Sequence, residues 1–231
     1  QVGLEKNFSE RSVAWALDLP GCFAYGKDGG EALINLPRAV VKHQEWIARH
    51  TPNSWLAELG DFDIRLVETF DTYTIDEVYE LAKEGYTVEC FFRHDWKPLT
   101  ELDVQRGLQL LSWSRADLLA VAAELTPEKL EEKQPGERWS INGILGHVGG
   151  AEWWYLERLD RAGLTRNEVP KAPLERLAVV RARLEQVLPG LVGVDLVMGK
   201  QGELWSPRKL LRRAIWHELD HVGHISRLAL S

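Results

Sequence analysis

Two histidines in the last fifteen residues, His217 and His221, have the spacing of a pair of metal ligands. On a helix, residues four positions apart lie one turn above each other on the same face, so both imidazoles can be directed at one point. Imidazole is the usual nitrogen ligand of zinc, nickel and iron. The pair supplies only two ligands, so a third has to come from another helix.

His147 is the candidate for the third ligand, because it lies beside Gly146 in a stretch that is otherwise apolar. A polar residue on the inner face of a helix bundle is costly unless it is satisfied, and bundle cores often hold metal sites built from facing helices. We therefore predict one divalent-metal site from His147, His217 and His221. Three histidines leave coordination positions for water or substrate, which is typical of catalytic metal sites.

Two alternatives remain open for these histidines. His147 could be a hydrogen-bonded core residue, and His224 lies on the same helix face as the pair, where we expect it beside the site or at the surface. Residues 217–221 also read H-E-x-x-H, the motif that gives zinc proteases two ligands and a general base. The usual downstream ligand is missing, since Val222-Gly223-His224 has a different spacing, so a zinc protease is a minor alternative.

The second half of the chain has the pattern of four helices that could position this site. They are predicted from Thr100 to about Leu125, from Ser140 to before Gly163, from Pro173 to Leu188, and from Ser206 to the end. This is the set of elements of a four-helix bundle. Residues 136–140 and 202–206 are similar runs that end in Trp-Ser, which indicates two helices with similar starts.

The first half combines strand and helix patterns. Alternating residues predict short strands at 13–17, 22–25, 64–68 and 88–92, and spacings of three and four predict helices at 30–50 and 75–82. We expect Pro37 to kink or divide the first of these helices. The chain is thus expected to have an α+β module at residues 1–97, followed by an all-α four-helix bundle at residues 98–231.

The overall composition is that of an ordinary globular protein, with 45% hydrophobic and 27% charged residues and a net charge of −7. The acidic balance argues against a nucleic-acid partner, and the cluster Arg208, Lys209, Arg212 and Arg213 is expected to be a solvated helix face. No run of about 18 apolar residues predicts a membrane span. Two cysteines without a C-x-x-C pair and the absence of signal-peptide features predict a cytoplasmic protein.

Two segments of the second half resemble the DinB-like superfamily. Residues 137–147 read E-R-W-S-I-N-G-I-L-G-H and are followed by A-E-W-W-Y at 151–155, which resembles the second helix of that family. Residues 216–225, W-H-E-L-D-H-V-G-H-I, resemble its fourth helix. The resemblance implies an up-down-down-up bundle that binds nickel or zinc through His147, His217 and His221, and it makes a homodimer an expectation. Characterised relatives include bacillithiol transferases, mycothiol-dependent isomerases and proposed metal-dependent hydrolases.

A second resemblance concerns residues 2–50. The run Leu19-Pro20-Gly21-Cys22, with Gly26 and Glu31-Ala32 before a helix, resembles a HicB-type antitoxin domain. A Pro-Gly turn between two strands explains the same residues without any such relationship. We interpret this half as an accessory module.

The function predicted from these features is that of a metal-dependent enzyme acting on a small-molecule substrate. A bound nickel, zinc or iron ion would lower the pKa of water or of a low-molecular-weight thiol, for hydrolysis or S-transfer. Glu218 could shuttle a proton, Arg213 could bind an anionic group of the substrate, and Trp154 could line the pocket. The alternative is a non-catalytic binding protein with a structural metal or none.

Overall fold

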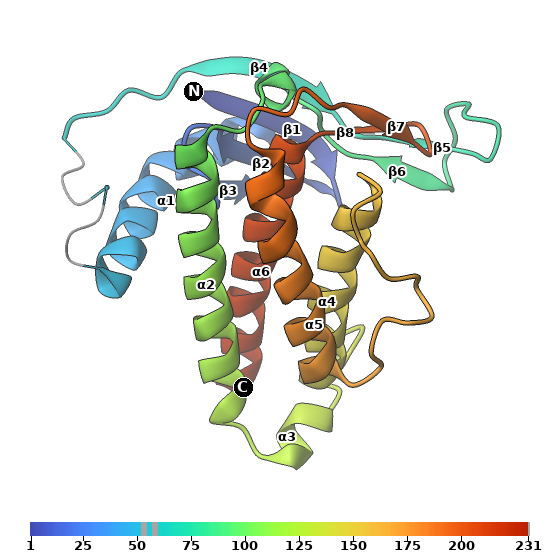
Figure 1. Cartoon of the computed structure of the whole chain (residues 1–231). Helices are drawn as coiled ribbons and strands as arrows, with labels where there is room; N and C mark the ends of the chain where they lie inside the picture. Colours follow the sequence, from blue (N-terminus) through green and yellow to red (C-terminus); the bar gives the residue numbers. More distant parts are fainter. Residues whose placement is uncertain (52–54, 57–59, 231) are drawn as a thin grey trace. The chain divides into compact units, whose positions relative to one another are not determined.

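The computed structural model describes residues 1–51, 55–56 and 60–230. It divides the chain into an α/β unit, residues 1–97 with 197–209, and a helical unit, residues 98–196 with 210–231 (Figure 1). In chain order, the elements are β1 (Val2–Phe8), β2 (Arg11–Ala16), β3 (Phe23–Gly26), α1 (Gly29–His50), β4 (Leu66–Asp71), β5 (Tyr73–Ile75), β6 (Tyr86–Val88), η1 (Arg93–Trp96), α2 (Glu101–Ala123), α3 (Pro127–Glu131), α4 (Ile141–Glu157), α5 (Pro173–Val187), η2 (Leu188–Leu191), β7 (Met198–Lys200), β8 (Glu203–Trp205) and α6 (Pro207–Ala229). Within the described residues, no helix combines the length and the apolar character that crossing a bilayer requires.

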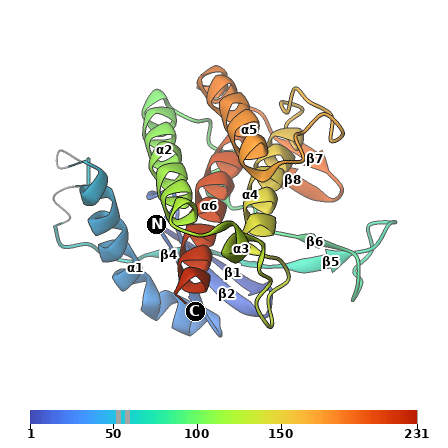
Figure 2. The same cartoon turned by 90° about the horizontal axis from the view of Figure 1, so that it is seen from below.

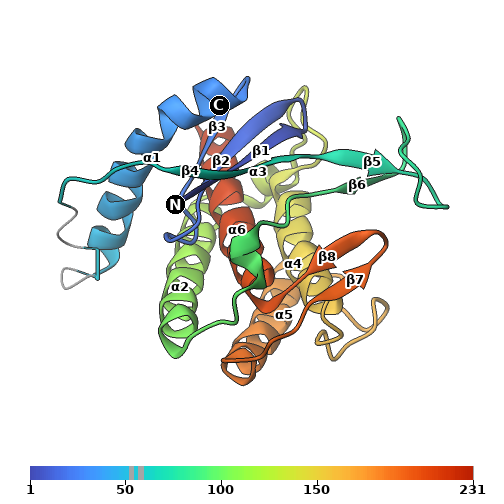
Figure 3. The same ribbon diagram turned by 90° about the horizontal axis from the view of Figure 1, so that it is seen from above.

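The α/β unit contains a mixed four-stranded sheet with the order β3-β2-β1-β4 (Figure 3). β2 is antiparallel to both β1 and β3, whereas β4 is parallel to β1. Helix α1 links β3 to β4, and its apolar stripe of Ala32, Leu36 and Val40 shares a core with Val2 and Leu4 of β1. The helix and the sheet thus bury each other's apolar face.

The connection from β3 into α1 depends on two residues. Asp28 caps the helix by accepting a hydrogen bond from the backbone N–H of Glu31. A Cβ at Gly26 would lie 2.2 Å from the backbone nitrogen of Ala32, so only glycine fits there. The expected division at Pro37 does not occur, because one helix runs from Gly29 to His50 through the proline.

The predicted helix over residues 75–82 is wrong. Tyr73–Ile75 instead forms strand β5, which pairs with Tyr86–Val88. The carboxylate of Asp76 accepts hydrogen bonds from the backbone N–H groups of Val78 and Glu80, which folds the segment into a turn. An Asp side chain that bonds to the backbone two residues on competes with helix formation, and this local competition outweighed the apolar spacing.

The prediction that the basic residues of α6 form a solvated helix face is also wrong. Lys209, Arg212 and Arg213 are all buried. The Nζ of Lys209 lies 2.6 Å from a carboxylate oxygen of Glu203 and 4.4 Å from the centroid of the Trp205 ring. Glu203 and Trp205 belong to the hairpin β7–β8, which was not predicted from the sequence, so the partner that permits burial of this lysine was not foreseen.

The helical unit is built from α2, α4, α5 and α6, which lie side by side (Figure 2). Their apolar faces share one core, to which Leu118 of α2, Ile144 of α4, Leu177 of α5 and Ile225 of α6 contribute. The predicted helix starts are confirmed where the structure gives the caps: Thr100 accepts from the N–H of Asp103, and Ser140 accepts from that of Gly143. The short helix α3 lies between α2 and α4 and was not predicted.

Candidate metal centre

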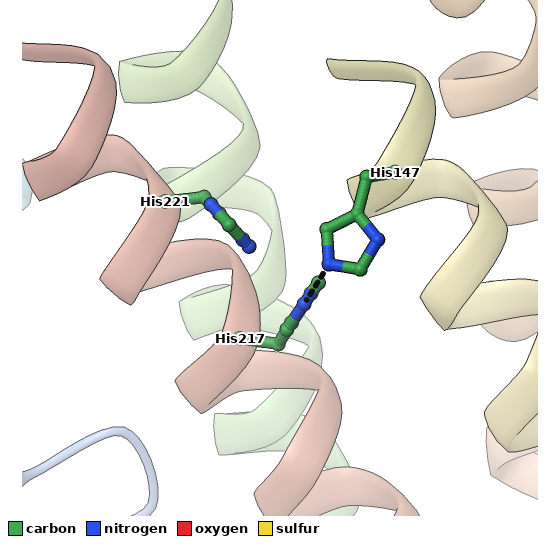
Figure 4. Close-up of side chains that lie close together, drawn as sticks. All are labelled: His147, His217 and His221. Carbon is green, nitrogen blue, oxygen red and sulfur yellow. Dashed lines mark hydrogen bonds between the residues drawn. The ribbon is translucent and has the colours of Figure 1, made fainter. Parts of the chain in front are cut away.

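The helical unit brings the three predicted ligands together. His147 comes from α4, whereas His217 and His221 lie one turn apart on α6, and the three side chains point toward one another (Figure 4). One nitrogen from each ring can be chosen so that all three lie within 4.8 Å of one another. The Nε2 atoms of His147 and His217 are 3.0 Å apart. Residues separated by 70 positions in the chain thus present nitrogen ligands to a common point.

The spacing of the His147 and His217 nitrogens fits a shared divalent cation. Two nitrogens that bind one ion at about 2.0–2.1 Å lie about 2.8–3.4 Å apart when the angle between them is near 90–110°. The observed 3.0 Å between His147 and His217 falls in that range. In addition, the buried Nδ1 of His221 makes no hydrogen bond within the described part of the chain.

The electrostatic setting keeps the three imidazoles neutral. Burial lowers the pKa of His217 well below its ordinary value, and the charges of His221, His147 and Arg213 lower it further. Burial, followed by the charges of His147 and His224, lowers the pKa of His221 to about 3. The pKa of His147 is also lowered, by burial and then by the charge of Arg138. Neutral imidazole is the form that binds metal ions, so the site is ready for a cation at neutral pH.

Aromatic side chains hold the ligand rings in place. The indole of Trp139 stacks on the imidazole of His147 at 4.7 Å between centroids, with 25° between the planes. The guanidinium of Arg138 lies 4.4 Å from the centroid of the Trp139 ring. Tyr155 presents its ring at 89° to that of His217, at 6.0 Å. Neither Trp139 nor Tyr155 was predicted to belong to the site, although Trp139 stands directly before the cap of the helix that carries His147.

The hydrogen-bond partners of Glu218 differ from those expected of a residue that shuttles protons beside a metal ion. Its carboxylate is 1% exposed and accepts hydrogen bonds from Ser114 and Arg115 of α2 and from Arg181 of α5. One residue along a helix corresponds to a rotation of about 100°, so Glu218 follows a ligand in sequence but faces a different direction. These bonds also separate the site from that of the H-E-x-x-H proteases, in which the glutamate acts beside the metal.

His224, which the sequence placed beside the pair, has a partner of its own. Its Nε2 lies 3.0 Å from a carboxylate oxygen of Glu137, and its ring is 5.8 Å from that of His221. Among the described residues, the group that could hold one metal ion consists of the three predicted histidines, without His224 or Glu218.

Arg213 and Trp154, the two residues expected to contact the substrate, have surroundings that differ from each other. Arg213 is 3% exposed, and its guanidinium lies 4.1 Å from the centroid of the Trp216 ring. Its charge contributes to the low pKa of His217, so it lies within electrostatic range of the histidines. Trp154 is half-buried and lies against Tyr155 and Arg158. A role for either residue toward a substrate stays a prediction.

With the geometry established, comparison with known proteins gives the class to which the chain belongs. Residues 110–225 match the DinB superfamily. The match covers half of the chain and includes all three histidines, so this protein belongs to the DinB superfamily. No curated protein and no solved structure matches the chain. The HicB-type resemblance of residues 2–50 stays a prediction.

Proposed function

We propose that His147, His217 and His221 hold one divalent metal ion, nickel, zinc or iron, and that the protein is a metal-dependent enzyme. The observation that carries this proposal is the convergence of three neutral imidazoles, with no fourth protein ligand among the residues that the structure describes. A structural site is usually closed by four protein ligands, whereas three leave a position for water or substrate. When bound, the ion would lower the pKa of a water molecule or a low-molecular-weight thiol for hydrolysis or S-transfer.

The residues around the ligands support binding rather than proton transfer. Trp139 and Tyr155 hold the imidazoles of His147 and His217, and Glu218 is engaged by two arginines. In this proposal the reaction uses a small-molecule substrate, whose anionic group would interact with Arg213. A cytoplasmic homodimer and an up-down-down-up order of the helices are part of the same proposal.

A non-catalytic protein with a structural metal is the second candidate, and the number of ligands distinguishes the two. His224 and Glu218 were the residues that could have closed the site, and both have other partners. This favours an open coordination position.

Elemental analysis of untagged protein, purified without chelators, tests the proposal. We expect close to one equivalent of nickel, zinc or iron in the parent and none in His147→Ala. His224→Ala serves as the matched control, because it removes a neighbouring imidazole that is paired with Glu137, and it should retain the metal. A parent that contains no metal, even after the ion is added back, would refute the metal site. A metal-loaded parent that neither hydrolyses esters or amides nor transfers thiols would favour the structural role.

A further inference from the structure

Four charged side chains form a closed ring inside the helical unit. Arg115 of α2 and Arg181 of α5 each bridge the two carboxylates of Glu152 on α4 and Glu218 on α6. Arg115 lies 2.9 Å from Glu152 and 2.5 Å from Glu218, and Arg181 lies 2.6 Å and 2.7 Å from the same two residues. Each of the four long helices therefore contributes one member, and the charges alternate around the ring.

The ring is internally complete although it is buried. Its side chains are between 1 and 10% exposed. Each of the four carboxylate oxygens accepts at least one of the ionic hydrogen bonds. The third nitrogen of each guanidinium, Nη1, donates to a backbone carbonyl, that of Leu177 for Arg115 and that of Leu111 for Arg181. Burial alone would lower the pKa of Arg181, but the charges of Glu152 and Glu218 raise it above its ordinary value, so the guanidinium stays charged.

The ring also has an internal symmetry that the sequence repeats. Arg115 and Glu152 are 37 positions apart, and so are Arg181 and Glu218. A shift of 66 positions carries residue 115 to 181, residue 152 to 218, and the helix-capping Ser140 to Ser206. Each arginine bonds to the carbonyl four residues before the other arginine. The pairs α2–α4 and α5–α6 thus meet the ring in equivalent ways.

The histidines break this symmetry. Under the same shift, the positions that correspond to His147, His217 and His221 hold Arg213, Ala151 and Tyr155. The ring is therefore symmetric between the two helix pairs, whereas the histidine site is not. Glu218 directly follows the ligand His217, and Glu152 lies five positions after the ligand His147.

The rotation of these helices decides whether the ligands meet. Side chains of a helix extend about 5–6 Å from its axis, so a rotation of about 20° displaces a ligand atom by about 2 Å. Such a displacement exceeds the tolerance of a metal site, whose distances hold within about 0.2 Å. Apolar side chains of similar volume usually stabilise a core at least as well as buried ion pairs do. Unlike apolar side chains, two planar guanidinium groups that each bond to two carboxylates also fix the geometry of these groups relative to one another.

We propose that the ring of Arg115, Glu152, Arg181 and Glu218 is a positioning device that fixes the rotation of α4 and α6, so that His147 meets His217 and His221. The proposal rests on the metal site proposed above. It makes Glu152 and Glu218 positioning residues, which act on the metal through the histidines of their own helices.

The test uses the full-length chain and Co²⁺ as a coloured probe. Glu152→Gln and Glu218→Gln keep the size of the side chain but remove its charge, whereas Arg181→Lys keeps a charge and loses the fork. Leu118→Ala is the matched control, because Leu118 is a fully buried residue of the same core and no ring bond involves it. For each variant, the thermal midpoint, the Co²⁺ dissociation constant and the Co²⁺ absorption spectrum are measured at a temperature where the protein is folded.

We expect the Co²⁺ dissociation constant to rise at least tenfold in the ring variants, with an altered spectrum. Leu118→Ala should lower the thermal midpoint and leave both metal readouts unchanged. Ring variants that lose stability but keep the parental constant and spectrum would overturn the proposal. If one glutamine variant does not fold, the other and Arg181→Lys carry the same comparison.

A second measurement tests the positioning role independently of metal binding. In metal-free protein, imidazole ¹⁵N spectra report the hydrogen bond between His147 and His217. Its loss in the ring variants, with retention in Leu118→Ala, supports the positioning role even if the parent binds no Co²⁺. Its retention in every variant would refute that role. A parent that fails to bind Co²⁺ would refute the proposed function.

Discussion

The Nε2 atoms of His147 and His217 lie 3.0 Å apart, although one residue is on α4 and the other on α6. Two neutral imidazoles at this distance share one proton in the absence of a cation, and with a cation both can be ligands. The pair is therefore the most direct point at which to test the site.

Replacing His217 or His221 with alanine should abolish tight metal binding. The two residues are on adjacent turns of one helix, so each variant leaves only one ligand on α6 and one on α4. We expect the stoichiometry measured by elemental analysis to fall from about one to near zero in both variants. His224→Ala, three positions further on, should keep the parental value, and a loss of metal there would add His224 to the ligands.

Replacing Trp139 with alanine should weaken metal binding without abolishing it. The indole stacks on His147 and restricts the orientation of its ring. Aromatic pairs contribute about 0.5–1.5 kcal/mol beyond their burial, so we expect the metal dissociation constant to rise about 2- to 12-fold. Competition with a coloured chelator measures this change. Trp139→Phe should recover most of the affinity, and an equal loss in both variants would show that stacking is not the cause.

Gly149 and Gly150 provide a matched pair on α4. A Cβ at Gly149 would lie 2.9 Å from Cγ of Arg176 and 3.2 Å from the backbone nitrogen of Leu177 on α5. We expect Gly149→Ala to lower the free energy of unfolding by about 1–3 kcal/mol, the usual cost of overpacking. At Gly150 the nearest atom is 3.6 Å away, so Gly150→Ala should be neutral or stabilising, by up to about 1 kcal/mol from helix propensity. Urea unfolding of both variants checks the contrast.

His43 of α1 should make the stability of the α/β unit depend on pH. It is buried and stacks on Trp46, and burial lowers its pKa to about 4 even though a hydrogen bond with the backbone of Pro20 opposes the shift. The unfolded chain binds the proton near pH 6.5 and the folded chain only near pH 4. This contribution to stability is therefore complete above pH 6.5 and is lost progressively as the pH falls toward 4.

Chemical unfolding of metal-free protein between pH 7.5 and 4.5 measures this effect. One such group changes the free energy of unfolding by at most about 1.4 kcal/mol per pH unit. His43→Gln should reduce the change of the free energy of unfolding with pH by up to that amount. The other buried histidines account for the pH dependence that remains. A slope that is the same in parent and variant would show that His43 does not titrate differently in the two states.

Local patterns in the sequence were sufficient to find the helices α1, α2, α4, α5 and α6 and the three histidines that could hold a metal ion. The spacing of His217 and His221 depends only on helical geometry, and Ser140 marks the start of the helix that carries His147. The helix at residues 29–50 and the strands β2, β3 and β4 were likewise predicted within a few residues. These features depend on neighbours in the chain, so a periodic pattern identifies them.

Tertiary structure decided which polar groups would be satisfied inside the protein. Glu218 was expected to act beside the metal, but arginines 37 and 103 positions away bind its carboxylate. Lys209 was expected in solvent, yet the hairpin β7–β8 supplies the carboxylate of Glu203 that permits its burial. The sequence determined which residues could be ligands, because helical periodicity is local. Only the folded chain determined the partners of the buried charges, because a charge is stable there only where distant segments bring its counter-charge within hydrogen-bonding distance.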